Sequence, residues 1–357
     1  MAVTGQRPWM VEGGTPERLR GAIRPVLVVA GIAVLASQVQ TGPPRAETVN
    51  PHPAGTYTYA GVARGTQPWL GVEHWPEIMQ AGSLVALLVF FTFAVRASRG
   101  QRVWNPLLVL GVAFVISTWM DPSANWVSYA AYNPELLHYR SGWWSDASPT
   151  VEPLLMAMSF PVVLSIPGVV AVALHRRRLA CNSGTGWAAK HPLIWLLAVS
   201  WAIGWGMDIF FFNDTATTEI YTYTQAPEWG VLFGGTTYQF PVLGALLVSG
   251  MMAVSGPLLR RDDRGATLAN RIGERIPVLR RHPNGAAVVA ACLVIALSMV
   301  PFYAVFGTIR LTHQARELAR PWVYQELKVY DPHGDYRLAG EPGPYFGESP
   351  TSVGGGR

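Results

Sequence analysis

The stretch Asp121–Glu152, DPSANWVSYAAYNPELLHYRSGWWSDASPTVE, lies between two apolar runs that are each long enough to cross a bilayer, Val103–Met120 and Pro153–Leu174. It contains four carboxylates, two Asn, three Trp and three Tyr. A connection that only joined two helices would not need this composition. Carboxylates and amides beside aromatic rings at a membrane surface predict a pocket that binds an amphiphile and moves protons on it. The alternative is an interfacial aromatic belt with helix caps.

The composition of the whole chain is that of a membrane protein. Half of the residues are hydrophobic and 14% are charged, against roughly 25% charged residues in soluble domains. A helix of about 20 apolar residues spans a bilayer. The runs that approach this length are Ala22–Gln38, Ile78–Val95, Val103–Met120, Pro153–Leu174, Pro192–Phe212, Tyr238–Ser255 and Gly285–Phe306. The sequence therefore predicts an all-α, polytopic membrane helix bundle of about seven transmembrane helices.

The distribution of cations predicts the orientation of this bundle. Of the 27 Lys and Arg residues, 18 lie in the N-terminal segment and in the second, fourth and sixth connections, and three lie in the alternate connections. The positive-inside rule then predicts a multi-pass plasma-membrane protein with a cytoplasmic N-terminus, and it places Asp121–Glu152 and the C-terminus on the extracytoplasmic side. We interpret the net charge of +5 as membrane topology and contact with anionic lipids, so no nucleic-acid partner is predicted.

Three regions follow from this pattern. Residues 1–21 are expected to be a flexible cytoplasmic leader, 22–306 the transmembrane domain and 307–357 an extracytoplasmic tail. In the tail, the pattern of Arg310–Arg320 predicts an amphipathic helix. The segments Trp322–Tyr330 and Tyr336–Ala339, joined by a Pro- and Gly-containing turn, predict a β-hairpin.

Several classes of chemistry are disfavoured by the residues that the chain lacks. The eight histidines all lie outside the seven apolar runs, which argues against bis-His haem, a desaturase-type diiron centre and an intramembrane zinc protease. Cys181 and Cys292 are expected on different sides or depths, so neither a disulfide nor a thiol metal site is predicted. No phosphate-binding loop, dinucleotide fingerprint or nucleophile elbow occurs. We expect no cofactor and no metal, which leaves acid–base chemistry or binding alone.

Three carboxylates stand out by their positions. Asp121 follows the third apolar run, and Pro122 is expected to end the helix there and leave Asp121 at the outer surface, near Asn125. Glu152 precedes Pro153 at the start of the fourth run, where a role as helix cap or cap neighbour explains it about as well as catalysis does. Asp208 lies within the fifth run, where an acid is costly and marks either a functional site or a buried pair.

The segment Asn213–Thr222 reads NDTATTEIYT, which is the translation of a widely used short-read sequencing adapter, and three Phe codons precede it as a homopolymer run would. We therefore assign no function to Asp214 or Glu219. We expect resequencing of the gene across codons 205–225 to return a different sequence at this segment. An unchanged reading from independently prepared DNA would make the segment native and would contradict this interpretation.

The chain resembles the spirocyclase AveC-like family of actinobacterial membrane proteins over roughly residues 22–306. The motifs that carry the resemblance, in order, are Asp121-Pro122 with Asn125, Tyr132-Asn133, Gly142-Trp143, Glu152-Pro153, Asp208 and Gly235-Thr236-Thr237-Tyr238-Gln239-Phe240-Pro241. The departure is Asn213–Thr222, where the family pattern has an apolar helix end with an acid. The resemblance implies spiroketal formation, in which a dihydroxy-ketone of polyketide origin loses water and closes two rings.

Two functional hypotheses remain. The first is a membrane-embedded cyclase or dehydratase that acts on a polyketide or lipid-like hydroxy-ketone by metal-free carboxylate chemistry. Its residues are Asp121, Glu152 and Asp208 for acid–base catalysis, Asn125, Asn133 and Gln239 for orienting the substrate, and Tyr132, Trp143 and Tyr238 for lining the pocket. The second is a non-enzymatic lipid-binding or transport-associated protein with the same pocket. A membrane scaffold ranks third and predicts no cavity.

Overall fold

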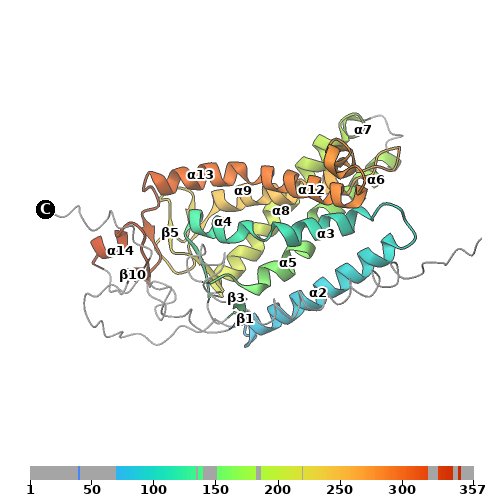
Figure 1. Ribbon diagram of the computed structural model, residues 1–357. Helices are drawn as coiled ribbons and strands as arrows, with labels where there is room; N and C mark the ends of the chain where they lie inside the picture. The colour runs from blue at the N-terminus through green and yellow to red at the C-terminus, as the bar shows by residue number, and fades with distance from the viewer. Residues whose placement is uncertain are drawn as a thin grey trace, which may run out of the picture. The chain divides into compact units, whose positions relative to one another are not determined.

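The computed structural model describes residues 70–133, 136–139, 151–181, 186–218, 220–320 and 329–340, together with the short strands β1 (Val39–Gln40) and β10 (Tyr345–Phe346). Within these residues the chain is mainly helical (Figure 1). The predicted leader, the first apolar run and Trp143 lie outside the described residues.

Long apolar helices identify the protein as a membrane protein. In the described part of the chain, five helical segments are long and apolar enough to cross a bilayer, and a bent pair raises the number to six. The five are α2 (Trp75–Ser98), α5 with α6 (Leu154–Val163 and Ile166–Cys181), α8 (Pro192–Thr217), α9 with α10 (Val242–Ala253 and Ser255–Leu259) and α12 with α13 (Pro283–Ser298 and Val300–Leu311). Each coincides with a run predicted from the sequence. The seventh predicted span rests on Ala22–Gln38, so that number stays a prediction.

The bent pair brings polar residues to the bundle. Helix α3 (Pro106–Ser117) begins at Asn105, whose side chain accepts a hydrogen bond from the Leu107 amide at 3.0 Å, a favourable N-cap before proline. Helix α4 (Met120–Ser128) follows at an angle of 54°. Pro122 lies in the first turn of α4, where a missing amide hydrogen costs nothing. The expected break in the helix is therefore present, but it precedes Pro122, and the short helix α4 resumes at Met120.

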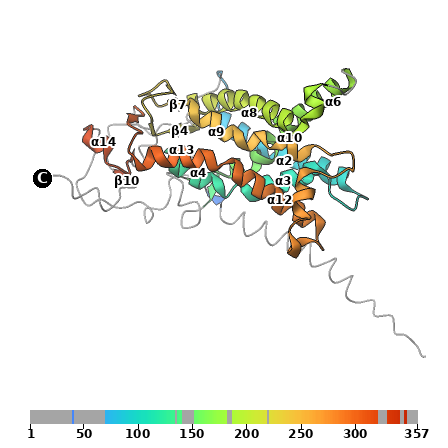
Figure 2. The ribbon, with the colours of Figure 1, turned by 90° about the horizontal axis from the view of Figure 1, so that it is seen from above.

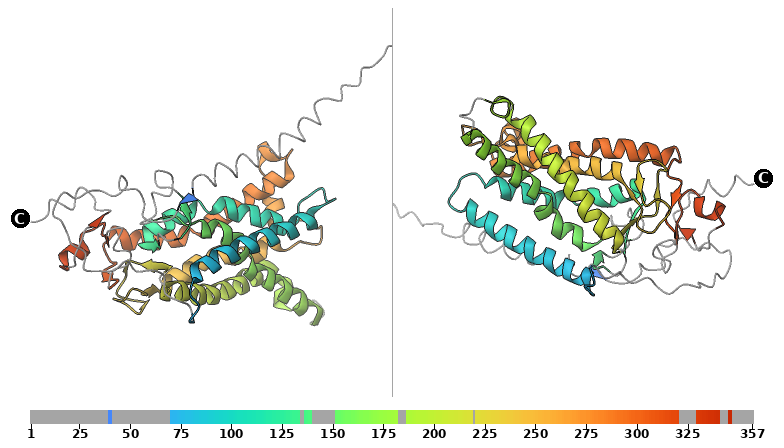
Figure 3. Two further views of the ribbon diagram at one scale, coloured as in Figure 1. Left: turned by 90° about the horizontal axis from the view of Figure 1, so that it is seen from below. Right: turned by 180° about the vertical axis from the view of Figure 1, so that it is seen from behind.

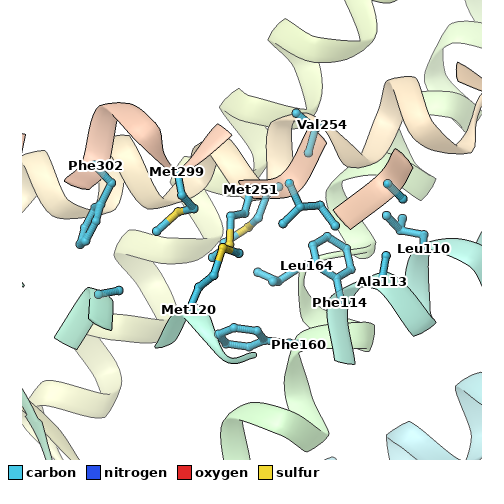
Figure 4. Close-up of a cluster of buried hydrophobic side chains, with 14 of the residues drawn as sticks. Leu110, Ala113, Phe114, Met120, Phe160, Leu164, Met251, Val254, Met299 and Phe302 are labelled. Carbon is cyan, nitrogen blue, oxygen red and sulfur yellow. The ribbon is translucent and has the colours of Figure 1, made fainter. Parts of the chain in front are cut away.

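The helices pack as neighbouring pairs. Helix α8 lies beside α9, and α13 lies beside α4 (Figure 2). Helix α2 packs on α5 and α3 at the edge of the bundle (Figure 3). Between them is an apolar core whose largest side chains are aromatic or sulfur-containing, including Phe114, Met120, Phe160, Met299 and Phe302 (Figure 4).

Two-residue and three-residue strands join the helix ends at one end of the bundle (Figure 1). The antiparallel pairs are β2 (Ala130–Tyr132) with β4 (Tyr221–Tyr223), β5 (Gln225–Ala226) with β8 (Glu317–Leu318) and β6 (Val231–Leu232) with β7 (Phe240–Pro241). Strand β3 (His138–Tyr139) makes a bridge from His138 to Pro153. The opposite end holds the Arg-rich connections with α7 (Trp187–Lys190), α11 (Leu268–Gly273) and the 3-10 helix η3 (Pro277–Leu279).

The structure corrects three expectations. Helix α13 ends at Leu311 and β8 follows, so Arg310–Arg320 is not one amphipathic helix. The predicted hairpin is also wrong, because Tyr336–Leu338 lies in α14 (Asp335–Leu338) and β9 (Val329–Tyr330) pairs in parallel with β10. The buried Tyr336 hydroxyl donates to the Thr224 carbonyl and holds α14 in this position. Finally, α6 continues to Cys181, so His175 lies within a helix long enough to span, contrary to the sequence-based boundary.

The close crossing of two helices at Gly168 leads to a prediction about stability. A Cβ atom on Gly168 of α6 would lie 2.5 Å from the Ser255 carbonyl carbon and 2.7 Å from the Gly256 nitrogen. Small residues allow such backbone contact in membrane bundles. We expect Gly168→Ala to lower the free energy of unfolding by about 1–3 kcal/mol, measured by thermal unfolding in detergent. The control is Gly206→Ala, where the added Cβ meets nothing within 4 Å. Equal unfolding midpoints for the two variants would contradict the prediction.

Candidate functional site

A cavity of about 280 Å³ lies beside the core, near the strand-rich end of the bundle. Helices α2, α4, α5, α8, α9 and α13 and strands β2 and β4 contribute to its walls. The side chains with oxygen atoms in its lining are Ser83, Asp121, Asn125, Ser128, Tyr132, Ser159, Asp208, Tyr221 and Tyr223. The remaining wall is apolar and rich in Met and Phe. The cavity therefore offers an apolar chamber with a few polar groups, which is the usual form of a small-molecule site.

A hydrogen-bonded pair of carboxyl groups lies at this cavity. The Asn125 amide donates to Asp121 Oδ2 at 3.1 Å and to Glu152 Oε2 at 3.4 Å. The Asp121 carboxyl is also hydrogen-bonded to Glu152 itself. Two carboxyl groups can hydrogen-bond to each other only when at least one of them carries a proton. The arrangement can therefore donate and accept a proton without moving a backbone element.

Only one member of the pair faces the cavity. Asp121 lines it and is half-buried, whereas Glu152 is buried and lies outside the lining. Two backbone hydrogen bonds fix the chain around Glu152. The Glu152 carbonyl accepts from the Tyr139 amide at 3.1 Å, and the Leu154 amide donates to the Leu137 carbonyl at 2.8 Å. The N-cap of α5 is Pro153, with no side-chain cap bond. Glu152 therefore directly precedes the N-cap of α5, which is the cap-neighbour position expected from the sequence.

Tyr132 completes the polar cluster. Its side chain is hydrogen-bonded to Asp121, and its ring lies 4.8 Å from that of Tyr221, centroid to centroid. Burial raises the pKa of Tyr132 well above its usual value, and the nearby charges of Asp121 and Glu152 raise it further. The phenol therefore keeps its proton, so its hydroxyl is a donor to the Asp121 carboxyl.

Asp208 lies on α8 and lines the same cavity. It is buried, and within the described residues its Oδ1 atom has no hydrogen-bond partner. The indole nitrogen of Trp205, one turn earlier, is likewise buried without a partner there. Burial raises the pKa of the Tyr223 phenol, which also lines the cavity, and the hydrogen bond with Tyr221 lowers it by less. A buried acid with an unused oxygen is costly unless a ligand uses it.

Comparison with known proteins identifies the family to which this chain belongs. Residues 99–330 match the family model described as spirocyclase AveC-like. The chain belongs to the spirocyclase AveC-like family. The match confirms the resemblance inferred from the motifs, and it includes Asp121, Glu152 and Asp208. No curated protein and no solved structure matches the chain.

Three further predicted site residues of this AveC-like protein, Asn133, Tyr238 and Gln239, lie outside the cavity lining. Gln239 is buried, and its amide donates to the carbonyls of Tyr223 at 2.9 Å and Glu317 at 3.1 Å, while its oxygen accepts from the Gly235 amide. It thus holds the strand ends together. Tyr238 is 39% exposed and its ring packs on Phe233. Asn133 is buried at the end of β2, outside the lining. Their roles in substrate binding stay predictions.

Sequence reasoning missed the contribution of α2 to the AveC-like cavity. Trp75, Met79 and Ser83 of α2 line it, although this helix precedes the matched segment. Ser83 is a polar residue inside an apolar run, which is a weak signal that could have been noticed. Tyr223 was missed because it adjoins the adapter-like segment. Tyr221 also lines the cavity, but it belongs to that segment, and no role is assigned to it.

Proposed function

We propose that this membrane protein is a spirocyclase-type cyclase and dehydratase that closes a dihydroxy-ketone of polyketide or lipid-like character into a spiroketal. The observation that carries the proposal is the hydrogen-bonded pair of Asp121 and Glu152 beside an apolar cavity. Membership of the spirocyclase AveC-like family supports the same reaction type. In this proposal the substrate is an amphiphile that enters from the membrane, on the side of the bundle that the positive-inside rule places outside.

The reaction needs proton transfer and no oxidant or reductant. One substrate hydroxyl adds to the ketone carbon while an acid protonates the ketone oxygen, and the attacking hydroxyl returns its proton to the conjugate base, which gives a neutral hemiketal. Protonation of the hemiketal hydroxyl then releases water and leaves an oxocarbenium ion. The second hydroxyl captures this cation and loses its proton to a base. The products are the spiroketal and one water, so an acid–base group that is returned to its starting state is sufficient.

We assign the proton transfers to Asp121 because it is the member of the pair that lines the cavity. Glu152 and Asn125 act as positioning residues that hold the shared proton and the Asp121 carboxyl in place. Asp208, on another helix of the lining, has a buried oxygen without a hydrogen-bond partner among the described residues, and this oxygen stabilises the developing cation. The rings of Trp75 and Tyr223 in the lining supply further negative π faces.

The test is turnover of a synthetic dihydroxy-ketone with a hydrocarbon tail by the purified full chain in detergent. The ketone oxygen carries a heavy-oxygen label. We expect loss of one water that contains the label, and a single spiroketal diastereomer rather than the mixture formed without protein. A panel that varies the spacing between hydroxyls and ketone covers the unknown ring size. Recovery of every ketone unchanged, under conditions in which it binds, would contradict the proposal.

A non-enzymatic lipid-binding or transport-associated role is the second candidate. The Met- and Phe-rich wall favours it, because flexible thioether side chains adapt to many apolar chains. This role predicts that a bound amphiphile is extracted chemically unchanged, and that Asp121→Asn binds it as well as the native protein. The scaffold hypothesis predicted no cavity and is contradicted by the cavity described above.

A further inference from the structure

A second cavity lies at the opposite end of the bundle, between the start of α3, α11 and the start of α12. Its volume is about 350 Å³. The charged side chains in its lining are those of Arg261, Arg264, Arg280 and Glu274. All four residues are exposed, so three Arg and one Glu lie along an open cavity, and the excess of positive charge suits an anion.

The connection that carries two of these arginines is firmly held. Asp262 Oδ1 accepts hydrogen bonds from the amides of Arg264 at 2.8 Å and Ala266 at 3.0 Å, and its other oxygen pairs with Arg271. Thr267 and Asn270 form a reciprocal capping box at the start of α11. The acid Asp262 thus neutralises Arg271, which lies outside the lining, and leaves the lining arginines with their charges available.

The walls of this cavity are set by close packing. A Cβ atom on Gly273 would lie 2.7 Å from the Ala286 carbonyl carbon, so α11 rests directly on α12. On the α3 side, the Trp104 amide donates to Asn284 Oδ1 at 2.9 Å. The indole of Trp104 lines the cavity and is 36% exposed. Trp residues are enriched at the interface between lipid tails and headgroups.

The lining arginines have few partners within the protein. Arg261 donates to Gln101 Oε1 at 3.3 Å. In the part of the chain that the structure describes, the side chains of Arg264 and Arg280 make no hydrogen bond or ion pair. Guanidinium groups bind phosphate through two parallel hydrogen bonds, which makes arginine the preferred residue for phosphate recognition.

We propose that this cavity binds a phosphate group, with Arg264 and Arg280 as its principal ligands and Arg261 as a third. The proposal is independent of the spirocyclase function. By the positive-inside rule the cavity faces the cytoplasmic leaflet, whose anionic phospholipids carry such a group. Free phosphate has the same chemistry, so the experiment includes both sources.

The test compares the full chain in detergent with two matched double variants by native mass spectrometry, using phosphatidylglycerol and inorganic phosphate as probes and phosphatidylcholine as the uncharged reference. The first variant is Arg264→Gln with Arg280→Gln. The second is Arg275→Gln with Arg281→Gln, which removes the same charge from exposed residues of the same connection outside the lining. Unfolding midpoints without ligand check that both variants are folded.

We expect the first double variant to bind the favoured probe at least about tenfold more weakly, and the second to change by less than about twofold. Preferential binding of phosphatidylglycerol identifies the source as a lipid headgroup, and binding of inorganic phosphate alone identifies a free anion. Equal losses of binding in the two variants would mean that binding depends only on the total positive charge of the connection, and this result would overturn the proposal. Unchanged binding in the first variant would overturn it as well.

Discussion

Asp121→Asn is expected to lower kcat in the dihydroxy-ketone assay by about 10²–10⁴-fold, the usual contribution of a general acid–base group. Asparagine has nearly the shape of aspartate but cannot donate and recover a carboxyl proton. The Asn125 amide donates to both carboxyl groups, and after the substitution it can still donate to the side-chain oxygen at position 121. The packing around this position is therefore expected to be kept. KM is expected to change much less than kcat, since the apolar wall that binds the substrate is untouched.

The control for this variant is Glu228→Gln, which removes an exposed acid at the strand-rich end of the bundle, outside the cavity lining. It is expected to leave kcat and the unfolding midpoint unchanged. Glu152→Gln keeps the size of the positioning residue and is expected to lower kcat and alter the pH profile without weakening substrate binding. Full activity of Asp121→Asn would remove the acid–base proposal, whereas equal losses in the Glu228 control would point to damage unrelated to the site.

Asp208→Leu is expected to have opposite effects on stability and activity. Within the described residues, Asp208 Oδ1 is buried without a partner, and such an atom costs about 1–3 kcal/mol. Replacement by an apolar side chain, with the adjoining cavity to take the extra methyl groups, is therefore expected to raise the free energy of unfolding by a similar amount. Activity is expected to fall at least about tenfold, because a group that stabilises the developing cation is lost.

Asp208→Asn is the matched variant for this prediction. It removes the charge but keeps two polar atoms in the same place, so little gain in stability is expected. Thermal unfolding in detergent and the dihydroxy-ketone assay together measure both properties. A loss of stability in Asp208→Leu relative to Asp208→Asn would mean that the carboxylate supports the fold, and Asp208 would then be a structural residue.

The helices were largely predictable. An apolar run of about 20 residues has low free energy only in a lipid phase, and there the backbone must satisfy its own hydrogen bonds, so it forms a helix. Predicted and observed spans therefore coincide on the described residues, apart from their ends. The ends were less predictable. Cys181 rather than Leu174 ends α6, and Leu311 rather than Phe306 ends α13, because polar residues can continue a helix beyond the membrane.

Part of the cavity lining was predictable from the sequence, but the arrangement of its residues was not. Asp121, Asn125, Tyr132 and Asp208 were selected by residue type and position, and all four line one cavity. Gln239 has the same kind of side chain as the selected amides, yet it bonds backbone carbonyls outside the cavity lining. The residue type determines which side-chain atoms can form hydrogen bonds, but it does not determine which partner atoms lie within reach of them.

By itself the sequence determined that this protein is a helical membrane protein of the spirocyclase AveC-like family, because hydrophobicity and short motifs act through residues close together in the chain. Only the tertiary structure decided that the side chain of Glu152, the residue before the N-cap of α5, bonds Asp121 and Asn125. Asn125 and Glu152 are 27 positions apart. Their contact depends on the bend between α3 and α4 and on the packing of helices around the cavity, which no local pattern encodes.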